Sequence, residues 1–186
     1  TKSAVAEAAL EAGAHIVIDI SGLGFAPDMA EVCAAYEAGL VLMHIKGVPR
    51  TLQKQIVYEG LFEEIEAYFK ERIAYALDAG IAPECIVLDP GIGFGKTVDH
   101  NYELMQQLAR FHDLGYGLLL GTSRKSFLGA ALQGRPATER VFGTAATIAA
   151  GVFAGIQIFR VHDVQEMSDV VRVSEAIVRG SHTTRG

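Results

Sequence analysis

The sequence predicts an α/β protein with a parallel β-sheet of about five strands and covering helices. The first observation is that short apolar runs alternate along the chain with longer stretches of helix-forming residues. The second is that these runs are apolar throughout, as in parallel strands that are covered on both faces. The third is that each run ends in polar or charged residues, which parallel strands would bring to one face of the sheet.

In chain order, one helix precedes five strand–helix units. We expect helices over residues 2–12, 28–38, 58–79, 99–112, shortly after 127, 139–154 and 164–179, and strands over 15–20, 40–43, 86–88, 118–120 and 156–161. Gly13, Gly39 and Gly80 follow the first three helices, where glycine commonly ends a helix. In the long third helix an apolar residue recurs at every fourth position, at Leu61, Ile65, Phe69, Ile73 and Leu77.

Length and composition limit the classes of protein. The 186 residues predict one domain over residues 1–180 and a polar tail over residues 181–186. A net charge of -6 argues against a surface for nucleic acid or anionic membranes. No apolar run approaches the roughly 20 residues of a membrane span, and the first residues do not resemble a signal peptide. Cys33 and Cys85 lack metal-ligand spacing and are expected as buried thiols, which predicts a cytoplasmic protein.

The glycine-rich segment 86–96 reads Ile-Val-Leu-Asp-Pro-Gly-Ile-Gly-Phe-Gly-Lys, a buried strand that delivers Asp89 to a turn. A phosphate-binding P-loop is excluded because Pro90 stands where that motif needs its first glycine. A dinucleotide fingerprint is excluded because Lys96 stands where its last glycine belongs. Two interpretations remain open here, a ligand-binding loop and a tight turn with an incidental aspartate.

Polar groups at the ends of all five expected strands indicate a binding site. They are Asp19, His44, Asp89, the 122–125 stretch, and Arg160 with His162. Six cations also fall near these ends: Lys46, Arg50, Lys96, Arg124, Lys125 and Arg160. Cations gathered in an acidic protein predict an anionic ligand group such as phosphate or pyrophosphate. The two acids predict a ligand that donates several N–H groups, such as an amino-substituted heterocycle.

Several of these residues also have a plainer interpretation. His44 fits a structural histidine at a strand end, and Asp19 fits a cap of the loop that follows it. Arg124 fits a scaffold ion pair, with Lys125 as the ligand-binding residue. Lys46 and Lys96 fit solvated surface lysines as well as functional ones.

Chain length leaves two architectures open. Five parallel strands with covering helices favour a doubly wound open sheet, because a complete (β/α)8 barrel usually takes about 250 residues. The same elements also fit a barrel whose first part is missing.

Three motifs give the chain a family resemblance. Asp89-Pro-Gly-Ile-Gly-Phe-Gly-Lys96, Gly121-Thr-Ser-Arg-Lys-Ser-Phe127 and Arg160-Val-His-Asp163 follow one another at suitable spacing. In this the chain resembles the dihydropteroate synthase family of folate biosynthesis. Related pterin-binding methyltransferases, some of them corrinoid-dependent, share the barrel but lack the Ser-Arg-Lys-Ser-Phe segment. The resemblance implies a (β/α)8 TIM-barrel fold that is partial here, with the N-terminal strands and their substrate loops missing.

The resemblance also implies an activity and a set of site residues. The family joins 6-hydroxymethyl-7,8-dihydropterin pyrophosphate to 4-aminobenzoate and releases pyrophosphate, with Mg²⁺ carried on the pyrophosphate and no metal ligand in this chain. Family members are sulfonamide targets, and we expect a homodimer. A scaffold whose incomplete barrel pairs with another copy is a further alternative, which a monomer in sedimentation experiments would contradict. The implied roles are pterin binding by Asp89, Met43, Gly93 and Lys125, a 4-aminobenzoate pocket with Phe94 and Ser126, pyrophosphate binding by Arg160 and His162, and catalysis by Lys125, Arg160 and His162.

One position departs from the family pattern. The family usually has Asn before the aspartate of the first expected strand, and this chain has Ile18 there. Since Ile neither donates nor accepts hydrogen bonds, one polar contact to the pterin is absent. An inactive or weakly binding fragment that folds or self-associates without turnover is therefore the alternative expectation.

Overall fold

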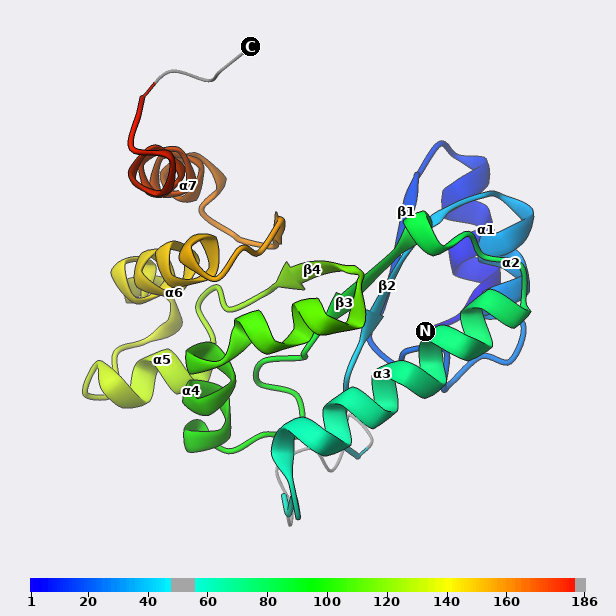
Figure 1. Ribbon diagram of the computed structural model, residues 1–186, viewed down its shortest axis with the longest axis horizontal. Coiled ribbons are helices and arrows are strands. Elements are labelled where there is room, and N and C mark those ends of the chain that lie inside the picture. The colour runs from blue at the N-terminus through cyan, green and yellow to red at the C-terminus, as the bar shows by residue number, and fades with distance from the viewer. Residues whose placement is uncertain (48–55, 183–186) are drawn as a thin grey trace.

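The computed structural model describes residues 1–47 and 56–182, with five strands and seven α-helices among them (Figure 1). In chain order they are α1 (Ser3–Glu11), β1 (Ile16–Asp19), α2 (Met29–Ala35), β2 (Gly39–Met43), α3 (Leu61–Asp78), β3 (Ile86–Asp89), α4 (Val98–Gln106), β4 (Gly117–Leu120), α5 (Ser126–Ala131), α6 (Val141–Phe153), β5 (Ile158–Phe159) and α7 (Val164–Arg179). Short 3-10 helices cover Pro83–Cys85, Leu108–Leu114 and Ala137–Glu139. The expected succession of elements is confirmed.

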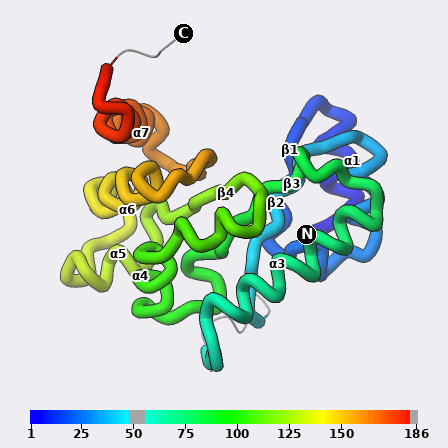
Figure 2. The backbone as a smooth tube through the Cα atoms, in the orientation of Figure 1, coloured from blue at the N-terminus to red at the C-terminus, as the bar shows by residue number. Residues whose placement is uncertain are grey.

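The strand order decides the architecture. The sheet runs β1-β2-β3-β4-β5, and every neighbouring pair is parallel. A doubly wound sheet would reverse its strand order at a switch point, whereas each strand here lies next to its predecessor, as in a barrel. The doubly wound alternative is therefore wrong, and the expected partial barrel of five strands is confirmed. The curved path of the strands can be followed in Figure 2.

The core lies between the strands and the helices that cover them. Buried side chains of β2, β3 and β4 join one hydrophobic cluster with α3 and the 108–114 segment, and the largest fully buried members are Phe69, Phe111, Phe127, Met29, Leu40, Leu42, Ile65 and Leu88. In Figure 1, α3 and α4 lie along the same side of the strands, and α6 and α7 pack on each other at the β5 end. This covering explains the apolar residues on one face of the central strands, while Val41, Met43 and Leu119 are buried outside this cluster.

The long helix α3 corrects one detail of the apolar stripe. Leu61, Ile65, Phe69 and Ile73 are buried as expected, but Leu77 is 37% exposed and Ala76 is fully buried in its place. A step of four residues turns about 40° beyond one full helical turn, so the fifth position of the stripe has rotated out of the contact face.

Several helices and strands are shorter than expected. The fourth helix ends at Gln106 and continues as a 3-10 helix, and the last strand keeps only Ile158 and Phe159. This strand pairs with β4 alone among the described residues, and a strand with one partner has fewer ladder hydrogen bonds to extend it. No helix within residues 1–47 and 56–182 combines the length and the apolar character needed to cross a membrane.

Candidate functional site

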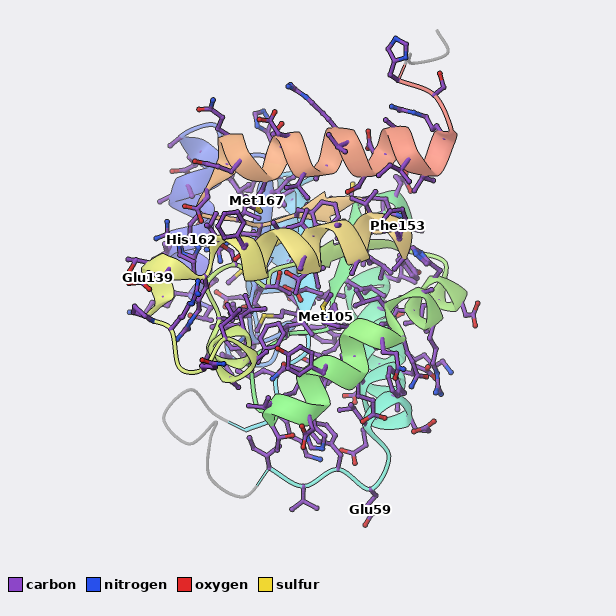
Figure 3. The ribbon with its side chains drawn as sticks, turned by 90° about the vertical axis from the view of Figure 1, so that its left-hand side faces the viewer. Glu59, Met105, Glu139, Phe153, His162 and Met167 are labelled. Carbon is purple, nitrogen blue, oxygen red and sulfur yellow. The ribbon has the colours of Figure 1, made fainter. Side chains whose placement is uncertain are left out.

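A cavity of about 210 Å³ opens at the carboxyl ends of the strands. Its walls are Ile18, Ile20, Met43, Asp89, Phe94, Gly121, Ser123, Lys125, Arg160 and His162, so all five strand ends contribute. Six of the eight residues that the sequence assigns to the site are among them, and Gly93 and Ser126 are not. In Figure 3, His162 lies with Glu139 at the end of the molecule where α6 and α7 begin, and Phe153 lies at the opposite end.

Asp89 ends β3 and is the carboxylate of this cavity. Its side chain is 6% exposed, and its Oδ1 accepts a hydrogen bond from the Gly91 N–H at 2.8 Å. Its Oδ2 has no hydrogen-bond partner among the described residues, so one acceptor remains for a ligand. Burial raises the pKa of Asp89 above its ordinary value, and Lys125, the Gly91 N–H, Lys96 and Arg160 act in the opposite direction.

The glycine-rich turn after Asp89 packs against the end of β2. Gly91 has φ +68°, and a Cβ at this position would lie 1.9 Å from the carbonyl oxygen of His44, so only glycine fits there. The turn closes through a hydrogen bond from the Phe94 N–H to the Gly91 carbonyl at 3.0 Å. Asn101 on α4 accepts from the Gly93 N–H at 2.6 Å. The loop is therefore held from both sides.

Lys96 and His44 form a buried hydrogen-bonded pair beneath this turn. Lys96 is only 6% exposed, so its interpretation as a solvated surface lysine is wrong. Its Nζ donates to the carbonyls of Gly91 at 3.0 Å and Phe94 at 3.1 Å and lies 2.9 Å from His44 Nδ1. An ammonium has three donors, and these three acceptors match them.

The protonation of His44 follows from the same contacts. Burial lowers the pKa of His44 to about 2, with Lys96 and Lys46 contributing. The neutral ring accepts from Lys96 at Nδ1, so its own proton is on Nε2. His44 is 4% exposed and does not line the cavity, which confirms its interpretation as a structural histidine.

Lys125 stands opposite Asp89 with its stem against the glycine turn. Its Nζ donates to the carbonyl of Ile92 and lies 4.7 Å from the centre of the Phe94 ring. A Cβ at Gly93 would lie 3.2 Å from Lys125 Cδ, so Gly93 makes room for this stem without lining the cavity. Burial lowers the pKa of Lys125 to about 8, Asp89 acts against this, and Arg160 adds to it.

Arg160 and His162 follow β5 and form the exposed side of the cavity. The Arg160 N–H donates to the Leu120 carbonyl at 3.0 Å, which continues the β4–β5 pairing to this point. His162 contacts Ser123 through both its backbone N–H and its ring. Arg160 and His162 thus line the same cavity as the carboxylate of Asp89.

Two other residues at strand ends serve the scaffold. Arg124 donates from Nε to Asp163 Oδ2 at 3.1 Å and also pairs through a second nitrogen with Oδ1, which confirms the scaffold ion pair. Asp19 accepts from the Ser21 hydroxyl and the Leu23 N–H, the latter at 2.7 Å, which confirms the loop cap. Lys46 pairs with Glu64.

Sequence reasoning assigned no individual role to Ile20, Gly121 or Ser123, although Ser123 belongs to the 122–125 stretch of polar strand-end residues, and it treated Ile18 only as a departure from a pattern. A period-two signal could have found the two isoleucines, because neighbours of the buried Asp19 point to the opposite side of β1. Ser126, in contrast, is exposed at the start of α5. Arg50 lies outside the described residues.

The remaining features of the described chain do not form a competing site. No group of three or more His, Cys, Asp or Glu side chains that could bind a metal ion occurs within residues 1–47 and 56–182. A separate cavity of about 460 Å³ lies at the amino ends of β2 and β3 and is lined partly by Cys33 and Cys85. Both cysteines are free thiols, and burial raises the pKa of Cys33 to about 11, which makes its thiol unreactive.

Comparison with known proteins places this geometry in a family. The family described as "Pterin binding enzyme" matches residues 1–162. A dihydropteroate synthase of Synechocystis sp. is 44% identical over 96% of this chain and 62% of its own length. The dihydropteroate synthase of Escherichia coli K12 is 40% identical over 100% of this chain and 65% of its own length.

A solved structure gives the same result for the fold. The crystal structure of Yersinia pestis dihydropteroate synthase with a sulfonamide drug complex superposes with a TM-score of 0.92 at 37% identity, over 95% of this chain and 64% of that one. The chain thus spans 62% to 65% of the length of the two curated relatives. With the family match over residues 1–162 and these likenesses, the chain belongs to the pterin-binding enzyme family.

Proposed function

We propose that this chain carries the later part of a dihydropteroate synthase site. The reaction would join 6-hydroxymethyl-7,8-dihydropterin pyrophosphate to 4-aminobenzoate and give dihydropteroate and pyrophosphate. The observation that carries the proposal is the pairing of a buried carboxylate, Asp89, with Lys125, Arg160 and His162 around one cavity. A ligand with N–H donors at one end and an anion at the other matches these groups.

Pterin binding would centre on Asp89. Its free Oδ2 would accept from an N–H of the heterocycle, while Oδ1 remains bonded to the Gly91 N–H. Lys125 would hydrogen-bond the ring from the opposite side, and Met43 and Phe94 would supply apolar contacts to its faces. The hydrogen bond between Lys96 and His44 would keep the glycine-rich turn in place when the ligand binds.

Loss of pyrophosphate would be the step that the protein assists most. As the carbon–oxygen bond of the pterin methylene breaks, negative charge grows on pyrophosphate, and Arg160 and His162 would stabilise it. The amine of 4-aminobenzoate would then form the carbon–nitrogen bond and release a proton. Phe94 would wall the site of this attack, and Ser126 lies at the start of α5 directly after Lys125.

Mg²⁺ would enter as part of the substrate. Asp89 is the only carboxylate among the residues that line the cavity, and it faces cationic side chains. A resident Mg²⁺ site needs several oxygen ligands, which the described residues do not gather here. The ion would therefore be carried on the pyrophosphate oxygens, without a ligand from the described residues.

A fragment that binds the pterin without turnover is the second candidate. One observation favours it: Ile18 lines the cavity where the family has an asparagine. Mixing the chain with both substrates and Mg²⁺ decides between the two, with released pyrophosphate as the readout. Release that depends on 4-aminobenzoate supports the synthase, and pterin binding without release supports the fragment.

Arg160→Ala is expected to abolish competition between pyrophosphate and the pterin substrate, because the anion loses its bidentate cationic partner. Pterin lacking the pyrophosphate should bind as before, since Asp89 and Lys125 are unchanged. Isothermal titration of both ligands measures this, and Arg179→Ala, on the last turn of α7, is the control for loss of one positive charge. Competition that persists in Arg160→Ala would remove Arg160 from the anion site.

A homodimer and a cytoplasmic location stay predictions. Exposed apolar side chains on α6 and α7 offer a surface for a second copy, and the most exposed are Phe142, Val164, Ile177, Val173, Val178 and Phe153. The two free thiols fit a reducing compartment.

A further inference from the structure

One hydroxyl group contacts two atoms of His162. The Oγ of Ser123 lies 2.9 Å from the ring atom Nδ1 of His162 and accepts from the backbone N–H of the same residue at 3.2 Å. Ser123 is buried at 6% exposed, comes from the loop after β4, and is 39 positions away in the chain. The two contacts therefore fix the ring against its own backbone across the β4–β5 junction.

Counting protons decides which atom donates to which. A serine hydroxyl has one proton and two acceptor lone pairs. The N–H of His162 uses one lone pair, so the hydroxyl proton is free to point elsewhere. Among the described residues Nδ1 of His162 is the one acceptor within hydrogen-bond distance of that hydroxyl, so the hydroxyl donates to Nδ1.

We propose that Ser123 is a positioning residue that holds the neutral imidazole of His162 in the tautomer with its proton on Nε2. Nε2 has no hydrogen-bond partner among the described residues, and His162 lines the cavity beside Arg160. The Nε2–H is thereby a donor for an anionic group of the ligand. The identity of that anion rests on the proposed function. The assignment of the tautomer is independent of it.

The loop that carries Ser123 is held rigidly enough for this role. The next residue, Arg124, has φ +59° and pairs with Asp163, the residue after His162. Its N–H donates to the Thr144 hydroxyl at 3.1 Å, and its carbonyl accepts from Arg140 at 2.9 Å. Two consecutive residues of the β4 loop thus contact two consecutive residues after β5, which fixes the register of the two loops.

The charged groups around the imidazole are of both signs. Asp163 follows it in the chain and is neutralised by Arg124, while Arg160, Lys125 and Asp89 line the same cavity. None of these side chains has a recorded hydrogen bond to the His162 ring in the described structure, so Ser123 alone contacts Nδ1. Removal of the Ser123 hydroxyl should therefore allow both neutral tautomers of His162 to be populated.

The ring nitrogens of histidine report this directly. The protein labelled with ¹⁵N at its six histidines gives ring correlations by NMR, and His162→Gln identifies the signals of His162. Where the ring of His162 is neutral, the wild-type protein should show the tautomer with the proton on Nε2. Ser123→Ala should show a mixture of both tautomers, and Ser123→Thr, which keeps the hydroxyl, should restore the single form.

Two results would overturn the proposal. A wild-type spectrum with the proton on Nδ1 would do so by itself, even if Ser123→Ala failed to fold. An unchanged tautomer in a folded Ser123→Ala would show that another group sets it. Neither readout needs substrate, so a chain that proves inactive leaves this test intact.

Binding of inorganic pyrophosphate supplies the second readout. At about pH 8, Ser123→Ala should bind it about threefold to tenfold more weakly, the effect of one misdirected hydrogen bond. In a His162→Gln background, Ser123→Ala should cause no further loss, because the ring that it positions is absent. A loss of equal size in that background would instead indicate that the Ser123 hydroxyl binds the anion itself, which contradicts the positioning role.

Discussion

Replacement of Asp89 by Asn is expected to weaken pterin binding more than tenfold. The amide oxygen of Asn can keep the bond to the Gly91 N–H that Asp89 Oδ1 makes at 2.8 Å. The amide nitrogen of Asn then takes the place of Oδ2. Its two N–H donors face the N–H donors of the pterin, so no hydrogen bond can form there. A tenfold loss is about 1.4 kcal/mol, which is modest for a lost charge-assisted hydrogen bond, so the true effect should exceed it. Calorimetry with the pterin substrate measures it.

Two controls separate this effect from misfolding and from net charge. The unfolding midpoint of Asp89→Asn should stay close to that of the wild-type protein, because removing a buried carboxylate whose pKa is raised also removes a desolvation cost. Asp78→Asn makes the same chemical change on an exposed residue at the far end of α3 and should leave pterin affinity unchanged. Pterin affinity unchanged in Asp89→Asn would exclude Asp89 from the pterin site.

Lys96→Met is expected to lower the free energy of unfolding by about 3 kcal/mol. Met fills the space of the lysine stem but leaves three acceptors without a donor: the carbonyls of Gly91 and Phe94 and the His44 ring. Each unsatisfied buried group costs about 1–3 kcal/mol, and the removed desolvation of the ammonium offsets part of the sum. Urea unfolding measures the loss at neutral pH.

The pH dependence gives Lys96 a specific signature. Burial lowers its pKa from 10.5 to about 7, so between these values the unfolded chain binds more protons than the folded one at this site. Stability should therefore rise with pH above about 7 in the wild-type protein. Since Cys33 has its pKa raised from 9.0 and acts oppositely at higher pH, the slope is best compared between pH 7 and 9. Lys125 contributes in the same direction in both proteins.

Lys96→Met should show a smaller slope in that window than the wild-type protein. The exposed Lys70 of α3 supplies the matched control, because Lys70→Met removes the same charge from solvent and should change stability by about 0.5 kcal/mol or less. If Lys96→Met instead unfolds at the same urea concentration as the wild-type protein, the hydrogen bonds of the Lys96 ammonium only offset the cost of its desolvation. In that case its contacts with the turn and His44 do not stabilise the fold.

Much of the site could be predicted because its residues follow buried parallel strands. Asp89, Lys125, Arg160 and His162 lie far apart in the chain, yet their strands end at one face, so their side chains meet there. Glycine spacing likewise predicted a sharp turn after Asp89, and Gly91 has the positive φ that such a turn requires. The strand ends and the turn depend on patterns among neighbouring residues, and such patterns can be recognised in a single sequence.

Other assignments depend on which way a side chain turns after the loops have folded. Lys96 and Lys125 both follow a strand end, but only the structure shows that Lys96 turns under the glycine turn and Lys125 into the cavity. Ser123 and Ser126 stand in one motif, and Ser123 lines the cavity while Ser126 is exposed. Three residues of offset place them on different sides of a loop whose path is set by contacts with Thr144 and Asp163.

By itself the sequence determined the succession of strands and helices, the end of the sheet that carries the site, and four of the groups around it. Only the tertiary structure decided that the strands follow one another without reversal, that Lys96 is buried against His44, and that Ser123 contacts His162. The physical reason is the range of the interactions. Periodicity and turn chemistry act between near neighbours, whereas those three features join residues that lie tens of positions apart and meet only in the folded chain.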